Sequence, residues 1–330
     1  MRKKYIDKTR ANKKIILCCC ILISTCAAQT LQIDSLKNKL TKATRKERLA
    51  VLYELSNALE GLFPKQALQY SLEGITLAEQ LGDKTSLATL YSSTAFSYGF
   101  IGDISQSLRY GFKSLELSNQ LNDKKRIASA HSALAITYSY LGQYSKSLEH
   151  HFETLRLREE LGLVNATLKT YNNIGIVYQK IGLYSNAIEY YKRALDGIQK
   201  NWNDTASVVR LMLNIGFTEF KVGHSSVAME YHTKALELAK KINFVNGLAY
   251  AYSNLGIMNT EMKNYIQALE YLHQSNKLYE ELGLKLGVVQ GLNSIGLVYF
   301  KIGKYDQAIK YLKQAVVQAQ HLNAPDVLKL

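Results

Sequence analysis

The chain has 330 residues, 47% of them apolar and 21% charged, which excludes a disordered or collagen-like protein. Its 41 Lys and Arg outnumber its 27 Asp and Glu, giving a formal net charge of +14. All four cysteines lie between Cys18 and Cys26, so the remaining chain has no disulfide framework, zinc knuckle or catalytic thiol.

The first 28 residues have the pattern of a secretory signal peptide. Residues 1–14 contain seven Lys and Arg against one Asp, residues 15–23 are an apolar run, and small residues follow as far as Ala28. A charged start, an apolar stretch of about 7–15 residues and a small-residue end are typical of an export signal. The run is shorter than the roughly 20 residues of a membrane-spanning helix. We therefore expect an exported protein that is periplasmic, or membrane-associated and facing the periplasm.

Two processing routes for this leader are open. We expect cleavage after Ala28. The alternative is lipidation, because the segment Ile23–Cys26 resembles a bacterial lipobox in which Cys26 carries a lipid anchor, although Thr25 stands where Gly, Ala or Ser is usual. Removing residues 1–14 lowers the net charge from +14 to about +8. Since much of the basicity belongs to the leader, we do not expect a nucleic-acid partner.

After a lead-in helix expected over residues 29–46, the chain repeats itself with a period of about 40 residues. Gly175, Gly216, Gly256 and Gly296 lie 41, 40 and 40 residues apart, and alanines continue the spacing upstream. The same six residue types follow at the same offsets in two copies: Tyr178, Gly182, Tyr184, Ala187, Tyr190 and Ala194, and Tyr299, Gly303, Tyr305, Ala308, Tyr311 and Ala315. A fixed period of this length indicates a stacked repeat architecture.

Each copy predicts two helices. Apolar residues recur at the i, i+3, i+4, i+7 spacing of one buried helix face from Ile174 to Ile181, and Gly182 is expected to end that helix. Ser185 is expected to cap the second helix. Small residues at the Gly and Ala positions let the two helices approach closely, and we interpret most of the 23 tyrosines as packing between them.

This pattern resembles the tetratricopeptide repeat, whose helix–turn–helix motif runs Leu-Gly, Tyr, Gly, Tyr, Ala, an aromatic residue and Ala. The resemblance covers residues 84–321, with a weaker copy before them, and the period is longer than the family's usual 34 residues. It implies an all-α fold, a right-handed α-solenoid of about seven units. The units are expected near residues 47–82, 84–122, 124–162, 164–202, 204–242, 244–283 and 285–322.

Two copies depart from the pattern. Glu219 and Asn259 each replace the first tyrosine of their copy, Ser225 replaces a second tyrosine, and Lys263 replaces the turn glycine. These departures predict looser packing around residues 219–225 and 259–264, or a bend in the solenoid there.

The sequence contains no dinucleotide-binding, P-loop, HExxH or GxSxG motif. His150 and His151 lie on a second helix, where His151 takes the aromatic core position, and His131, His232 and His273 also fall on periodic positions. We interpret all five as packing residues. No enzyme activity, cofactor or metal site is expected for this chain.

The predicted binding site is a groove along the first helices of the pairs. Asparagine recurs at one repeat position or one residue before it, and lysine recurs seven residues after it. These residues are Asn172, Asn173, Asn214, Asn254, Asn293, Lys180, Lys221 and Lys301. The resemblance implies that such side chains hold an extended peptide, since an amide both donates and accepts hydrogen bonds and lysine attracts carboxylates. Apolar pockets are expected from Phe96, Phe217, Phe220 and Phe300.

A structural interpretation of the same residues stays open. Lysine in the last turn of a helix is favoured by the helix dipole alone. Asparagine beside a packing glycine could bond a neighbouring helix. Glu261 interrupts the lysine series.

Residues 323–326 predict the start of a further, incomplete repeat at 323–330, with Pro325 in the first turn. With the leader, this organisation is similar to the exported N-terminal input region of bacterial sensor histidine kinases or cyclases of the tetratricopeptide repeat type. Our first hypothesis is such a module, which binds a protein or peptide of unknown identity and is followed by a transmembrane segment. The second is a stand-alone periplasmic or lipid-anchored scaffold of an envelope complex.

Overall fold

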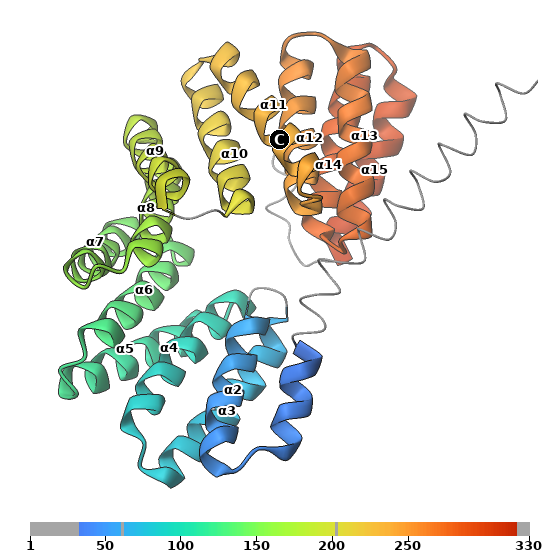
Figure 1. Ribbon diagram of the computed structural model, residues 1–330. Coiled ribbons are helices and arrows are strands. Elements are labelled where there is room, and N and C mark those ends of the chain that lie inside the picture. Colours follow the sequence, from blue (N-terminus) through green and yellow to red (C-terminus); the bar gives the residue numbers. More distant parts are fainter. Residues whose placement is uncertain (1–32, 61–62, 202–203, 322–330) are drawn as a thin grey trace, which may run out of the picture. The chain divides into compact units, whose positions relative to one another are not determined.

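The computed structural model describes residues 33–60, 63–201 and 204–321 (Figure 1). All secondary-structure elements in these residues are helices, which confirms the predicted all-α class. The expected signal peptide over residues 1–28, the lipidation candidate Cys26 and the helix start at 323–326 lie outside the described residues.

A short helix over residues 33–42 is followed by helices arranged in pairs, and from α4 onward the two helices of each pair are joined by a tight turn. The pairs are α2 (Arg45–Leu59) and α3 (Pro64–Leu81), α4 (Lys84–Ile101) and α5 (Ile104–Gln120), α6 (Lys124–Tyr140) and α7 (Tyr144–Glu160), α8 (Val164–Lys180) and α9 (Tyr184–Asn201), α10 (Thr205–Val222) and α11 (Ser225–Lys241), α12 (Val245–Glu261) and α13 (Tyr265–Glu281), and α14 (Lys285–Lys301) and α15 (Tyr305–His321). The predicted helical-repeat solenoid is confirmed.

The helix contacts divide the chain into two compact units, residues 1–177 and 178–330, so the division falls near the end of α8. In the first unit, α3 packs on α4, α5 on α6, and the first helices α4 and α6 also touch each other. In the second unit, α11 packs on α12 and α13 on α14, and the first helices α10, α12 and α14 are neighbours in that order. The predicted right-handed superhelix concerns the whole array and stays a prediction.

Local sequence sets the helix boundaries. Asp83, Asp103 and Asp123 cap α4, α5 and α6, each by accepting a hydrogen bond from the backbone N–H three residues later. Gly182 has a φ of 81°, in the left-handed region that glycine enters without a steric penalty, and it follows α8 as expected. The expected cap Ser185 was wrong. Helix α9 begins at Tyr184, and the Ala187 N–H bonds to the Leu183 carbonyl, so Ser185 lies inside the first turn.

The glycines of the repeat lie where the two helices of a pair touch. A Cβ atom added to Gly256 would lie 2.6 Å from Cγ of Leu272, and one added to Gly296 would lie 2.8 Å from Cγ of Leu312. Both distances are shorter than carbon atoms tolerate, so a larger residue at either position would push the helices apart. The expected close approach at these glycines is confirmed.

The tyrosines form stacked ring pairs between the two helices of a pair. The stacked pairs have centroids 5.3 to 5.6 Å apart and planes 12 to 25° from parallel, and each joins a first helix to its own second helix. They are Tyr98 with Tyr110, Tyr138 with His150, Tyr178 with Tyr190, and Tyr299 with Tyr311. In two of these pairs a third ring, from two turns earlier on the first helix, tilts against the same second-helix residue: Tyr91 on Tyr110, and His131 on His150. The tyrosines of these ring contacts are therefore packing residues, as predicted.

Polar side chains replace the stacked ring where the repeat departs from its pattern. Glu219 is only 6% exposed, accepts a hydrogen bond from His224 Nδ1 at 2.7 Å, and lies 3.7 Å from Lys192 Nζ. Asn259 is 7% exposed, and its Nδ2 donates to the Leu255 carbonyl at 2.8 Å. Both positions are thus buried and bonded rather than loosely packed.

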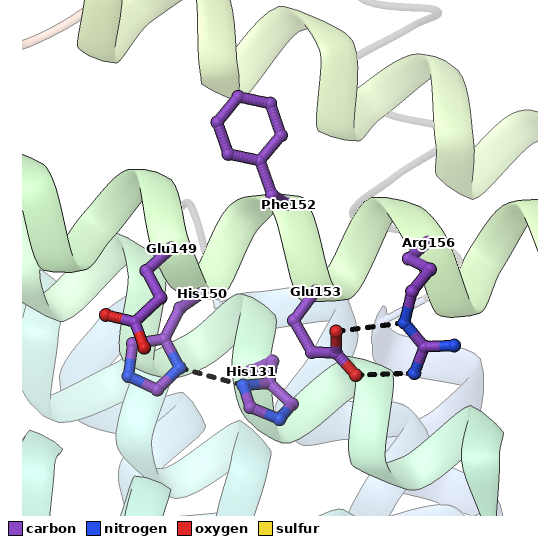
Figure 2. Close-up of a pocket in the computed structure, with 6 residues that line it drawn as sticks. All are labelled: His131, Glu149, His150, Phe152, Glu153 and Arg156. Atoms are coloured by element: carbon purple, nitrogen blue, oxygen red, sulfur yellow. Dashed lines mark hydrogen bonds and ion pairs between the residues drawn. The ribbon is translucent and has the colours of Figure 1, made fainter.

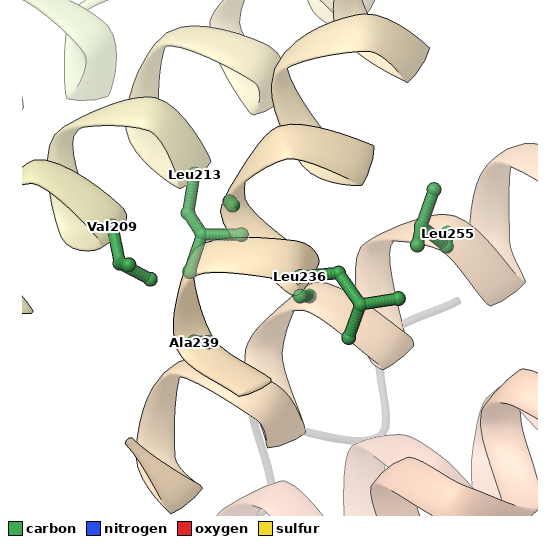
Figure 3. Close-up of a cluster of buried hydrophobic side chains, with 7 residues drawn as sticks. Val209, Leu213, Leu236, Ala239 and Leu255 are labelled. Atoms are coloured by element: carbon green, nitrogen blue, oxygen red, sulfur yellow. The ribbon is translucent and has the colours of Figure 1, made fainter. Parts of the chain in front are cut away.

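Apolar clusters fill the space between successive pairs. One joins α10, α11 and α12 through Val209, Leu213, Leu236 and Leu255, together with three buried alanines (Figure 3). Burying side chains of this size stabilises a fold by about 1.5–3 kcal/mol each.

Within the described residues, no helix is both long enough and apolar enough to cross a membrane.

Candidate functional site

All eight residues predicted for the groove lie on first helices. Asn172, Asn173 and Lys180 are on α8, where the two asparagines fall before the division between the units and Lys180 after it. The other residues, all in the second unit, are Asn214 and Lys221 on α10, Asn254 on α12, and Asn293 and Lys301 on α14. The asparagines are half-buried and the lysines are exposed. The side chain of each predicted residue is thus at least partly accessible to solvent.

At one asparagine of the second unit, hydrogen bonds join two helices. The carbonyl of Asn214 accepts a hydrogen bond from Thr218 Oγ1 at 2.7 Å. The same hydroxyl accepts a hydrogen bond of 2.7 Å from Gln179 Nε2, at the end of α8. In the first unit, Asn172 Nδ2 donates to Asn173 Oδ1 at 3.4 Å. The backbone of α10 at Asn214 is therefore linked to the end of α8 through Thr218.

The charged positions of α10, α12 and α14 interact with their surroundings. Lys301 Nζ lies 3.1 Å from Glu261 Oε1, and these residues occupy equivalent positions of successive repeats. Glu261 therefore pairs with a member of the lysine series that it interrupts. Lys221 Nζ lies 5.4 Å from the ring centre of Phe217, one turn earlier on the same helix. This row of side chains keeps a net positive charge, since it contains the ammonium groups of Lys221 and Lys301 and the single carboxylate of Glu261.

A second candidate site, which sequence reasoning missed, lies on α6 and α7. An open pocket of about 540 Å³ is lined by His131, Glu149, His150, Phe152, Glu153 and Arg156 (Figure 2). His131 Nδ1 and His150 Nδ1 are 2.8 Å apart, so one imidazole donates a hydrogen bond to the other. Glu153 receives two hydrogen bonds from Arg156, of 2.6 and 3.0 Å. The signal was present in the sequence, because both histidines stand at tyrosine positions of the repeat.

Burial governs the proton affinities of these histidines. Loss of solvation lowers the pKa of His131 below 6.5, and the nearby His150 lowers it further, against the opposing charges of Glu153 and Glu149. Burial also lowers the pKa of His150. Both rings are therefore neutral at neutral pH. The described residues bring together no group of three or more His, Cys, Asp or Glu side chains that could hold a metal ion.

Two other histidines are buried in the core, as predicted. His151 and His232 are each 1% exposed and occupy the same position of their second helices. Burial lowers the pKa of His151 to about 3 and that of His232 to about 4. Near His151, the half-buried Arg158 donates to the Ala166 carbonyl at 3.1 Å and to Thr170 Oγ1 at 2.7 Å.

Sequence models of the tetratricopeptide repeat match residues 130–164, 166–241 and 247–317. A search of the curated proteins finds no significant match to this sequence.

Several solved structures are similar in fold. The apo form of the quorum sensor NprR from B. thuringiensis is 17% identical, with a TM-score of 0.69 over 96% of this chain and 92% of that chain. A Rap protein complexed with Competence and Sporulation Factor is 17% identical, with a TM-score of 0.67 over 88% of this chain and 80% of that chain. Aspartyl phosphate phosphatase F from Bacillus subtilis is 18% identical, with a TM-score of 0.66 over 87% of this chain and 75% of that chain.

Proposed function

This chain belongs to the tetratricopeptide repeat family, and we propose that it is a non-enzymatic module whose first helices bind an extended segment of a protein or peptide. The observation that carries the proposal is the recurrence of a half-buried asparagine, two residues before the packed glycine, at Asn173, Asn214 and Asn254. The core does not require an amide there, since serine or alanine occupies the position in other copies.

The spacing of the first helices suits an extended chain. Packed helices lie about 8–10 Å apart, and an extended peptide rises about 3.3 Å per residue. Amides on the neighbouring first helices α10 and α12 of the second unit would therefore meet the backbone of such a peptide about every third residue. An amide can donate to a backbone carbonyl and accept from a backbone N–H, so it binds a peptide largely independently of its sequence.

The lysines bias this site towards acidic segments. Lys221 and Lys301 outweigh Glu261 in the row of charges along α10, α12 and α14. Exposed charges of this kind raise the rate of association with an oppositely charged partner and are screened by salt.

We further propose that the module acts outside the cytoplasm as the sensory input of a signal-transduction protein. Support comes from the leader-like pattern of residues 1–28 and from the fold shared with the quorum sensor NprR. A reporter fused after Leu330 should be active outside the cytoplasm, and Ile21→Arg in the apolar run should abolish that activity. Retention of the unmutated fusion in the cytoplasm would contradict export.

The binding proposal is tested with a library of random dodecapeptides displayed on phage. The mature protein should select peptides, and a selected peptide should bind the double variant Asn214→Ala/Asn254→Ala about fivefold to a hundredfold more weakly, as expected for two lost hydrogen bonds. Its melting temperature should stay nearly unchanged. Asn119→Ala, an exposed asparagine on the second helix α5, is the control and should bind normally. A double variant that unfolds would mean that the amides are structural.

A further inference from the structure

The third pair, α6 and α7, departs from the repeat at two positions whose side chains touch. At the position of His150 the other pairs have a tyrosine, namely Tyr70, Tyr110, Tyr190, Tyr231, Tyr271 and Tyr311. At the position of His131 the other pairs have tyrosine or an apolar residue, namely Val51, Tyr91, Tyr171, Met212, Tyr252 and Leu292. Histidine therefore stands at both positions in this pair alone.

Packing does not explain the double replacement. Tyr91 and Tyr110 make the same contact with ring centroids 5.7 Å apart, and Tyr252 makes it with Tyr271 at 5.8 Å. The two imidazole centroids are 5.0 Å apart, and their Nδ1 atoms meet at 2.8 Å. Because imidazole has less apolar surface than a phenol ring, the exchange gives up packing for a pair of facing nitrogen atoms.

The nitrogen atoms face a site that solvent and ions can reach. Both rings are half-buried and line the open pocket of about 540 Å³ on α6 and α7. Figure 2 shows the carboxylates of Glu149 and Glu153 on either side of the facing rings. Arg156 pairs with Glu153, whereas no ion pair among the described residues includes Glu149. With both imidazoles neutral, the lining carries two negative charges against one positive charge, which favours a cation.

The separation of the nitrogen atoms suits two donors of one metal ion. Imidazole nitrogen binds a divalent transition metal at about 2.0–2.1 Å, so two such donors at a right angle lie about 2.9 Å apart. The Nδ1 atoms of His131 and His150 are 2.8 Å apart. An ion can therefore replace the hydrogen atom that the two nitrogens share, provided that each ring turns until its lone pair points at the ion. That hydrogen atom moves to Nε2 of its own ring by exchange with water, so the protein neither gains nor loses a proton.

We propose that His131 and His150 form a two-histidine site for a divalent transition metal ion, Cu²⁺ or Ni²⁺, that links α6 to α7. Neutral imidazoles at a right angle suit these ions, whereas the hard cations Mg²⁺ and Ca²⁺ require oxygen donors. Water molecules complete the coordination shell, since the described residues bring together no group of three such side chains. Glu149 and Glu153 attract the ion through their charge. This inference goes beyond the proposed function and does not depend on a bound peptide.

The test titrates Cu²⁺, Ni²⁺ and Mg²⁺ into the mature protein, prepared without an affinity tag, by isothermal titration calorimetry. One Cu²⁺ or Ni²⁺ should bind per chain, and Mg²⁺ should not bind. The variant His131→Tyr/His150→Tyr should bind the ion at least tenfold to a hundredfold more weakly, because a change even behind a metal ligand costs that much. Since Tyr91 and Tyr110 already make this contact, the variant should fold, which its circular dichroism spectrum checks. The variant His131→Gln/His150→Gln gives a second measurement that does not depend on the tyrosines.

Single variants separate a shared ion from two independent histidines. His131→Tyr and His150→Tyr should each lose as much affinity as the double variant, because one ion needs both rings, and Cu²⁺ should show two coordinated imidazoles by electron paramagnetic resonance. The control His224→Gln/His273→Gln removes two exposed histidines outside the pocket and should bind as the unmutated protein does. Additive losses, loss of the ion in the control, equal binding by the double variant, or no binding by the unmutated protein would overturn the site.

Discussion

The imidazole of His232 lies directly against the backbone of Gly216, so that a Cβ atom on Gly216 would be 2.8 Å from Cε1 of the ring. The ring is 1% exposed, and its Nδ1 finds no hydrogen-bond partner in the structure. A polar, ionisable ring thus occupies the position that leucine takes in the next two pairs, at Leu272 and Leu312.

Gly216→Leu should destabilise the array by about 1–3 kcal/mol, because the new side chain cannot fit between α10 and the buried ring of His232. Chemical denaturation of the mature protein measures the change. Thr233→Leu introduces the same residue at an exposed position of α11 and should leave the free energy of unfolding within about 0.5 kcal/mol. If both substitutions changed the free energy of unfolding equally, the contact between Gly216 and His232 would be unimportant for stability.

His232→Leu should remove part of the acid sensitivity of the fold. Burial lowers the folded-state pKa of His232 from 6.5 to about 4, so the unfolded chain binds the proton more tightly. Wild-type stability therefore falls as the pH drops from about 6.5 towards 4, by up to about 3 kcal/mol from this group, and is fully present above that window. The difference in unfolding free energy between variant and wild type should grow across the same window. If the difference in unfolding free energy did not depend on pH, the acid sensitivity would not come from His232.

His131→Tyr/His150→Tyr should restore the aromatic contact that Tyr91 and Tyr110 make in the preceding pair. Both histidines have pKa values lowered by burial, so their contribution to stability is present above pH 6.5 and is lost as the pH falls below it. The double variant should lose this dependence, measured as melting temperature against pH. An unchanged profile would mean that the histidine pair does not respond to protons.

Glu261→Gln and Lys301→Gln should change binding in opposite directions. The first frees the Lys301 ammonium group from its 3.1 Å partner and should strengthen binding of an acidic peptide selected from the phage library. The second should weaken it, and both effects should diminish at high salt. Stability should change by less than about 1 kcal/mol in either variant, since the pair is partly exposed. If both variants bind the peptide more strongly, or both bind it more weakly, the two residues lie outside the binding surface.

The repeat fold could be predicted from the sequence because every element of it is local. Glycine at the helix contact, tyrosine at the stacked rings and glycine in the turn recur at fixed offsets, so each copy confirms the interpretation of the others. The cap at Ser185 was misplaced because a serine in the first turn is one or two residues from a serine at the cap, and periodicity does not resolve that difference.

The side-chain pairs were harder to predict. His131 and His150 are 19 residues apart on different helices, and only the position of both in the tyrosine register indicates that they meet. Glu261 looked like an interruption of the lysine series because the sequence does not show that equivalent positions of successive first helices lie within reach of each other. The eight groove residues lie on first helices as expected, but a ligand contact is a property of the complex and stays a prediction.

The stacked rings also bear on how such an array changes over generations. Each stack closes within its own pair of helices, so one pair can exchange its rings for histidine, as α6 and α7 have done, while neighbouring pairs keep their tyrosines. A pair can therefore be duplicated, deleted or transplanted as a unit without redesigning its interior. Only the apolar surface between pairs, such as that of Val209, Leu236 and Leu255, has to match the new neighbour. New specificities can then arise by shuffling whole pairs rather than by altering one core residue at a time.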